Sequence, residues 1–240
     1  FTFYGDLLGV GSAYRLSANA AHQKLNDFYN ETFRTLNAFC DNHLNSVEMF
    51  SDSLLIQGDD ALSALPDIAS VFANLIPKGL LLRGAIVNGR LSYDARVTRP
   101  NFAKRLPEGD TLARAVGLEK MQKGSRFLVE SPLANELMRD FPAWLTHEGY
   151  IKSITENRPE PLRRICPTPD SNSYEYLYYW RDQTAFSEYG QEIKNLKAIR
   201  GMYEKLTREH FEETIGVIQR AQQRYRATIE ARPAVPPARR

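Results

Sequence analysis

Apolar runs of strand length alternate with longer segments of helical periodicity along most of the chain. Strands are expected over residues 1–8, 46–57 (a hairpin), 80–91, 126–130 and 174–180. Helices are expected over residues 19–41, 60–76, 110–122 and from about 131 onward. The order β-α-β-β-α-β-α-β predicts an α/β fold of the α+β sandwich type, with a ferredoxin-like, mainly antiparallel sheet and helices on one side.

The C-terminal part of the chain follows a different pattern. Residues 153–172 are rich in proline and polar side chains, and a loop is expected there. From about residue 184 an apolar helical face is opposed by a heavily charged one, which indicates an external helical arm. We therefore predict a main domain over residues 1–182, a C-terminal helical extension over 183–232 and a disordered tail over 233–240.

Composition narrows the function classes. The 240 residues are 42% hydrophobic and 25% charged, and the net charge of +2 argues neither for nor against a polyanionic partner. It does not predict a nucleic-acid binder, so no nucleic-acid partner is expected. No apolar stretch approaches the ~20 residues that span a bilayer, and no signal peptide opens the chain, so a cytoplasmic location is expected. The two cysteines, Cys40 and Cys166, are expected to be reduced and mostly buried.

Two aspartates stand where strands rarely carry acids. Asp6 and Asp52 each lie at the polar end of an apolar run. Two carboxylates on adjacent strand ends repel each other and suit a hard divalent cation, because Mg²⁺ is bound by one or two carboxylates together with substrate phosphates. This pattern favours a metal-dependent enzyme acting on a nucleotide phosphate. The alternative is that one aspartate caps a turn and the other is solvated.

The residues around the aspartates add candidate binding groups. Strand alternation places Glu48 and Phe50 on the same face as Asp52. This face would offer an aromatic wall and a polar group able to read a base. The turn after the first strand exposes backbone N–H groups that could hold a triphosphate, which makes Leu8 and Gly9 further candidates.

Four segments resemble the catalytic domain of class III nucleotidyl cyclases, in the family's order and within residues 1–130. The family's first strand ends in Asp-hydrophobic-x-Gly, and its central hairpin ends in Gly-Asp. A strand of characteristic sequence follows, and the next helix opens with Gly-Asn-Thr-hydrophobic. The matching segments here are Asp6-Leu7-Leu8-Gly9, Ser51-Asp52, Leu82-Arg83-Gly84-Ala85-Ile86-Val87-Asn88-Gly89 and Gly109-Asp110-Thr111-Leu112.

The departures from the family pattern concern substrate choice. Purine cyclases carry a base-reading Lys (adenine) or Glu (guanine) four residues before the second metal aspartate, and Glu48 stands at that position. Their second base-reading position falls on Leu106, and their transition-state Asn and Arg fall on Ala113 and Gly117. Arg114, next to the vacant Asn position, is the candidate for the cation that transition-state stabilisation requires.

With these departures the chain is more similar to the pyrimidine cyclases of the bacterial Pycsar anti-phage systems. That resemblance implies conversion of UTP, in preference to CTP, into 3′,5′-cyclic UMP (or cyclic CMP), which activates a separate effector protein. It also implies a homodimer whose composite active sites take the metal acids from one protomer and helix residues from the other. Glu48 leaves the base open, because a carboxylate accepts a hydrogen bond from uracil N3–H or from the cytosine amino group.

The resemblance further implies two-metal catalysis. Asp6, Asp52 and the Leu7 carbonyl would hold two divalent cations, Mn²⁺ or Mg²⁺. One ion would lower the pKa of the ribose 3′-hydroxyl, and the other would steady the triphosphate. Some of the cations that precede the next helix are expected to meet that triphosphate: Arg83, Arg90, Arg96, Arg99, Lys104 and Arg105.

Three rival interpretations remain at this stage. A purine (adenylate or guanylate) cyclase shares the motifs. A diguanylate cyclase would carry a Gly-Gly-acid-acid-Phe run where this chain has Ser51-Asp52-Ser53. A catalytically inactive cyclase homologue that only binds a nucleotide is favoured by the missing Asn and Arg and opposed by the two retained aspartates.

Overall fold

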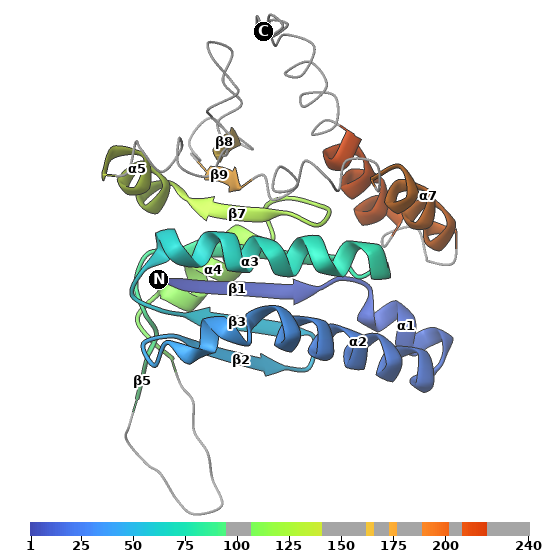
Figure 1. Cartoon of the computed structure of the whole chain (residues 1–240), viewed down its shortest axis with the longest axis horizontal. Coiled ribbons are helices and arrows are strands. Elements are labelled where there is room, and N and C mark those ends of the chain that lie inside the picture. Colours follow the sequence, from blue (N-terminus) through green and yellow to red (C-terminus); the bar gives the residue numbers. More distant parts are fainter. Residues whose placement is uncertain (95–106, 141–161, 166–172, 177–188, 202–207, 220–240) are drawn as a thin grey trace, which may run out of the picture.

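The structure is a computed structural model that describes residues 1–94, 107–140, 162–165, 173–176, 189–201 and 208–219. A seven-stranded sheet runs in the order β2-β3-β1-β4-β7-β9-β8 (Figure 1). Only the β4–β7 pair is parallel among the neighbours in this sheet. Its strands are β1 (Thr2–Leu7), β2 (Ser46–Phe50), β3 (Ser53–Gln57), β4 (Leu82–Val87), β7 (Phe127–Glu130), β8 (Leu162–Ile165) and β9 (Ser173–Tyr176). A small separate ladder pairs β5 (Ser92–Tyr93) with β6 (Pro107–Glu108).

Helices cover both faces of the sheet. In Figure 1, α2 and α3 lie in front of the strands and α4 lies behind β1. The described helices are α1 (Val10–Leu16), α2 (Ala18–Leu36), α3 (Ala61–Leu75), α4 (Thr111–Glu119), α5 (Ser131–Asp140), α7 (Tyr189–Arg200) and residues 208–219, with 3₁₀ turns at Ala38–Asp41 and Ile76–Lys78. The mixed α/β architecture is as expected, but the expectation that helices cover one side only is wrong.

Strand β4 explains why two faces need covering. Its residues Leu82 and Ile86 belong to the large core under α2 and α3. Ala85 and Val87 point the other way and form a second buried cluster that includes Ala115 of α4. Since a strand apolar on both faces must be covered on both, α4 packs opposite the other helices.

Three aromatic rings form the centre of the large core. The Phe72 and Phe127 rings stack with centroids 5.3 Å apart, and Phe3 meets Phe127 edge-on at 5.4 Å. Gly84 leaves room for this arrangement, because a Cβ placed there would lie 2.4 Å from Phe3 Cζ. The ring of Phe3 therefore packs directly against the backbone of β4.

The C-terminal helices belong to the same core. Ile193 and Leu196 of α7, and Phe211 and Ile218 of residues 208–219, are buried with the sheet residues. The expectation of an external arm is wrong, since the apolar face that suggested it is covered by the main domain. The predicted boundary at residues 182/183 and the predicted tail over 233–240 fall outside the described residues.

Two smaller expectations are corrected. Strand β8 lies within residues 153–172, where a loop is expected from the sequence. It forms the edge of the sheet next to β9. Cys40 is exposed, and Cys166 lies outside the described residues. No helix in the described part of the chain is both long enough and apolar enough to cross a membrane.

Candidate active site

Strand register brings the two aspartates to one end of the sheet. Asp6, near the end of β1, pairs with Ser53 at the start of β3. Asp52 lies in the β2–β3 turn, where Ser51 adopts a left-handed conformation with φ of 55°. The backbone N–H of Leu7 donates to the carbonyl oxygen of Asp52 at 2.8 Å, which ties the hairpin tip to the end of β1.

The electrostatics of this pair suit a divalent cation. Burial and the neighbouring Asp52 raise the pKa of Asp6, and the positive charges of Arg83 and Lys120 oppose this rise. A cation between the two carboxylates would remove their repulsion. Among the described residues no group of three or more His, Cys, Asp or Glu forms a metal site. Two carboxylates still fit Mg²⁺ or Mn²⁺, which take their other ligands from carbonyls, water and substrate phosphates.

Of the cations that the sequence singles out, Arg83 lies beside the aspartates, and Lys120 also acts on Asp6. In β4 it is the register partner of Asp6, and its Nε donates to Glu119 Oε1 at the end of α4. The Glu119 side chain is 1% exposed and that of Arg83 is 14% exposed. Of the other cations that the sequence singles out, Arg90 pairs with Asp59 at 2.8 Å. The remaining four, Arg96, Arg99, Lys104 and Arg105, lie outside the described residues.

The face of the sheet beside the aspartates carries the candidate base-reading groups. Alternation along β2 puts Glu48 and Phe50 opposite Val47 and Met49, whose side chains pack against the large core. Phe50 is 83% exposed, so it is no part of the core and is free to act as a wall. The hydroxyls of Tyr4 and Ser53 are hydrogen-bonded at 3.1 Å on the same face. Leu106 lies outside the described residues.

The turn after β1 supplies fewer amides than the sequence suggested. The N–H of Leu8 donates to the carbonyl of Leu81 at 2.8 Å, and that of Leu7 is held by Asp52. Leu8 is therefore ruled out as a donor to a phosphate. Gly9, with φ of 82°, precedes the first turn of α1, where amides lack intrahelical acceptors. The Ala13 N–H already donates to the Gly9 carbonyl at 3.0 Å, so the candidate amides are those of Gly9, Val10 and Gly11.

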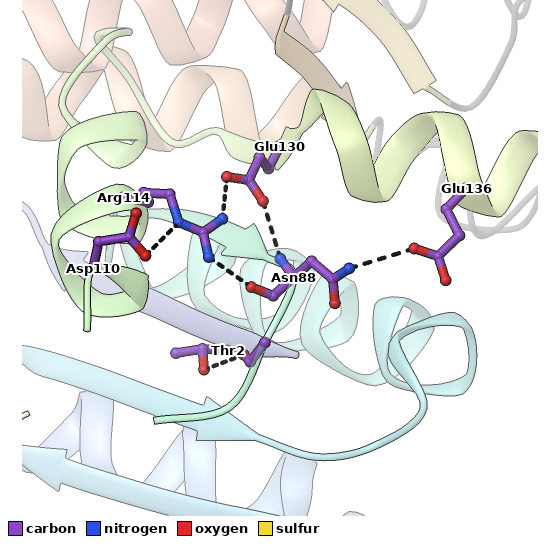
Figure 2. Close-up of polar contacts among 7 residues, drawn as sticks. Thr2, Asn88, Asp110, Arg114, Glu130 and Glu136 are labelled. Carbon is purple, nitrogen blue, oxygen red and sulfur yellow. Dashed lines mark hydrogen bonds and ion pairs between the residues drawn. The ribbon is translucent and has the colours of Figure 1, made fainter. Parts of the chain in front are cut away.

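Arg114 lies at the other end of α4. Figure 2 shows its guanidinium between Glu130, Asp110 (3.2 Å) and the carbonyl of Asn88 (3.0 Å). Because Arg83 pairs with Asp6, it lies at the end of β4 that is near the aspartates. Asn88 is five residues further along the chain, a distance of about 16 Å at ~3.3 Å per residue of strand. The structure does not bring Arg114 to the two aspartates.

Comparison with known proteins identifies the architecture. No protein-family model and no curated protein matches the chain. Among solved structures, the adenylyl cyclase CyaB from P. aeruginosa superposes with a TM-score of 0.50 and 14% identity over 72% of this chain and 91% of that chain. The chain has the class III nucleotidyl cyclase fold. The guanylyl cyclase Cya2 is also similar, with a TM-score of 0.47 and 14% identity over 72% of this chain and 89% of that chain.

A C-terminal helix reaches the aspartate end of this cyclase fold. From residues 208–219, His210 Nδ1 accepts the N–H of Gly124 at 3.0 Å, and Thr214 Oγ1 accepts the N–H of Ser125 at 2.8 Å. Glu213 forms an ion pair with Arg126. These contacts hold the loop between α4 and β7. The sequence carries no local signal for them, since the partners are more than 80 residues apart.

Proposed function

We propose that the chain is a nucleotidyl cyclase, which converts a nucleoside triphosphate into a 3′,5′-cyclic nucleotide and pyrophosphate. The observation that carries the proposal is the meeting of Asp6 and Asp52 at one end of a cyclase-fold sheet, with Arg83 beside them. Two facing carboxylates next to a guanidinium suit a metal-bound triphosphate, because they combine ligands for the metal with a cation for the phosphates.

Each of these residues has a role in the proposed reaction. Asp6, Asp52 and the Leu7 carbonyl would hold two divalent cations, Mn²⁺ or Mg²⁺. When bound, such ions acidify a hydroxyl and neutralise phosphate charge. The ribose 3′-hydroxyl loses its proton to water, and its oxygen attacks the α-phosphorus. The bond from that phosphorus to the oxygen that bridges to the β-phosphate breaks, and this oxygen leaves with the pyrophosphate. Arg83 binds phosphate oxygens as negative charge moves onto the leaving pyrophosphate, and the amides of Gly9, Val10 and Gly11 contact the same group.

A pyrimidine triphosphate is the proposed substrate, UTP ahead of CTP. Phe50 is exposed and able to stack on a base. Glu48 precedes it by two residues in β2, so both side chains lie on the same face of the strand. A carboxylate there accepts the N3–H of uracil. The two positions where purine cyclases keep Asn and Arg hold Ala113 and Gly117. A guanylate cyclase is the second candidate, because a glutamate at the position of Glu48 also suits guanine.

The proposed assembly is a head-to-tail homodimer with composite sites. Arg114 lies far from the aspartates of its own protomer, and Ala113 and Gly117 lie on the exposed side of α4. In a head-to-tail pair, this side of α4 from one protomer would approach the aspartates of the other. The cyclic product would act as a second messenger on a separate effector protein in anti-phage defence.

Purified protein incubated with each of the four ribonucleoside triphosphates and Mn²⁺ or Mg²⁺ tests the proposal, with the product identified by mass spectrometry. We expect cyclic UMP from UTP and no product from Asp52→Ala. Cyclic product from ATP or GTP alone would overturn the pyrimidine assignment. Full turnover by Asp52→Ala would overturn the assignment of Asp52 as a metal ligand. No product from any triphosphate would overturn the cyclase itself.

A further inference from the structure

Glu119 is a buried acid that the proposed reaction does not use. Its side chain is 1% exposed, and one oxygen accepts Arg83 Nε. The other oxygen, Oε2, is also buried, and no group in the described segments of the chain forms a hydrogen bond with it. Burying a carboxylate with half of its acceptor capacity unused is costly, and a pair of apolar residues would often be at least as stable. The position of the pair beside Asp6 suggests a reason other than stability.

The geometry of the pair restricts how Arg83 can point. A guanidinium is planar, so fixing the direction of its Nε–H also fixes the directions of its two terminal amino groups. Glu119 takes the Nε–H. Within the part of the chain that the structure describes, neither terminal amino group of Arg83 has a hydrogen-bond partner. With 14% of its side chain exposed, Arg83 has little freedom to turn elsewhere.

We propose that Glu119 is a positioning residue, which holds Arg83 by its Nε so that both terminal amino groups face the phosphate chain of a bound triphosphate. Glu119 itself touches no substrate and acts only through Arg83. This inference rests on the proposed function, since the phosphate chain is that of the nucleotide. Bidentate binding of a phosphate by the two amino groups gives both geometric specificity and strength.

Charge alone would have the opposite effect on binding. Glu119 adds a negative charge close to Asp6 and Asp52, so removing it should attract a polyanion more strongly. If Glu119 positions Arg83, removing it should weaken phosphate binding in spite of the lost repulsion. The sign of the change therefore separates the two effects.

The test is calorimetric binding of inorganic tripolyphosphate to the whole chain in Mg²⁺. We expect Glu119→Ala to weaken binding by about 10- to 100-fold, since loss of a hydrogen bond to a charged group has an effect of this size. Glu119→Gln keeps an acceptor oxygen and should recover part of the loss. The matched control is Glu31→Ala. Glu31 is 5% exposed and paired with Arg34 on α2, across the sheet from α4. This variant should bind tripolyphosphate as wild type does.

A double-mutant cycle decides whether Glu119 acts through Arg83. In the Arg83→Ala background, Glu119→Ala should cause no further loss of tripolyphosphate binding. Three results would each overturn the inference. They are an equal loss of tripolyphosphate affinity in both backgrounds, unchanged or tighter binding by Glu119→Ala, and no binding by wild type. If Glu119→Ala does not fold, Glu119→Gln completes the cycle under the same criterion. Coupling without cyclisation of any nucleotide would overturn the proposed function and leave the positioning role standing.

Discussion

At the scale of single residues, Asp6 shows how the site balances its charges. Burial and the neighbouring Asp52 raise its pKa, against the opposing charge of Arg83. An acid whose pKa is higher in the folded than in the unfolded chain contributes stability fully at pH values below its ordinary pKa, about 4. That contribution is lost as pH rises through the higher, folded value. At neutral pH, the metal-free protein therefore carries a destabilising charge at this position.

Replacing Asp6 by Asn should separate stability from metal binding. Without metal at neutral pH, we expect Asp6→Asn to melt at the wild-type temperature or above it. Asparagine carries no charge, so the variant does not bury a carboxylate beside Asp52. At a Mn²⁺ concentration 100 times its Kd, wild type should gain about 2.7 kcal/mol. This is a rise of roughly 5–10 °C for a chain of this size. Asp6→Asn should gain almost nothing.

Thermal unfolding with and without Mn²⁺ measures both effects. Asp59→Asn is the control, since Asp59 is 54% exposed and its pair with Arg90 lies at the surface. A lower melting temperature for metal-free Asp6→Asn would contradict the raised pKa of Asp6. A Mn²⁺ gain equal to that of wild type would contradict the metal assignment.

At the scale of the elements, two glycines have opposite roles. In β4, a Cβ at Gly84 would lie 2.4 Å from Phe3 Cζ and 3.0 Å from the Tyr4 carbonyl oxygen. In α4, a Cβ at Gly117 would meet nothing within 4 Å. One glycine is required by close packing, whereas the other only loosens a helix.

Alanine at these two positions should change stability in opposite directions. We expect Gly84→Ala to lower the free energy of unfolding by about 1–3 kcal/mol through overpacking. Gly117→Ala should raise it by about 0.5–1 kcal/mol, because alanine favours a helix interior. Urea denaturation of the two variants measures the difference. Equal effects of the same sign would show that the packing around Gly84 is looser than described.

The contact between residues 208–219 and the loop after α4 can be tested by removing one hydroxyl group, that of Thr214. Thr214→Val removes the acceptor of the Ser125 N–H, and Ser125 is 0% exposed, so this amide loses its partner. We expect a loss of about 1–3 kcal/mol in the free energy of unfolding, measured by urea denaturation. Glu212→Gln, which breaks the exposed pair with Arg200 at 3.4 Å, should cost far less. Comparable losses would argue against the docking of this helix.

At the scale of the whole molecule, the residues assigned to catalysis lie at two ends of one protomer. Asp6 and Asp52 are at one end of the sheet, and Arg114 is held near Asn88 at the other. This separation is the reason for the proposed composite site, which can be tested by mixing inactive variants.

We expect Asp52→Ala and Arg114→Ala to be inactive alone and to regain activity when mixed. A head-to-tail heterodimer would keep one site with both aspartates and the arginine, giving about a quarter of wild-type activity after random exchange of subunits. Cyclic nucleotide formation and light scattering of the mixture measure the result. A monomer in solution, or no recovery after exchange, would overturn the composite site.

Much of the sheet and of the aspartate pair could be predicted from the sequence, because both depend on local patterns. Apolar runs and the polar tip at Ser51-Asp52 specify a hairpin, and alternation within it places Glu48 and Phe50 on one face. The apolar face of residues 208–218 was also visible, although not what it would contact.

Only the tertiary structure decided which polar groups meet, because this depends on strand order and on partners far apart in sequence. It placed Arg83 beside the aspartates and Arg114 away from them, and it used the Leu8 amide within the sheet. It also put α4 on the second face and packed residues 208–219 into the core. Local periodicity tells which face of an element is apolar, whereas long-range packing decides what covers that face.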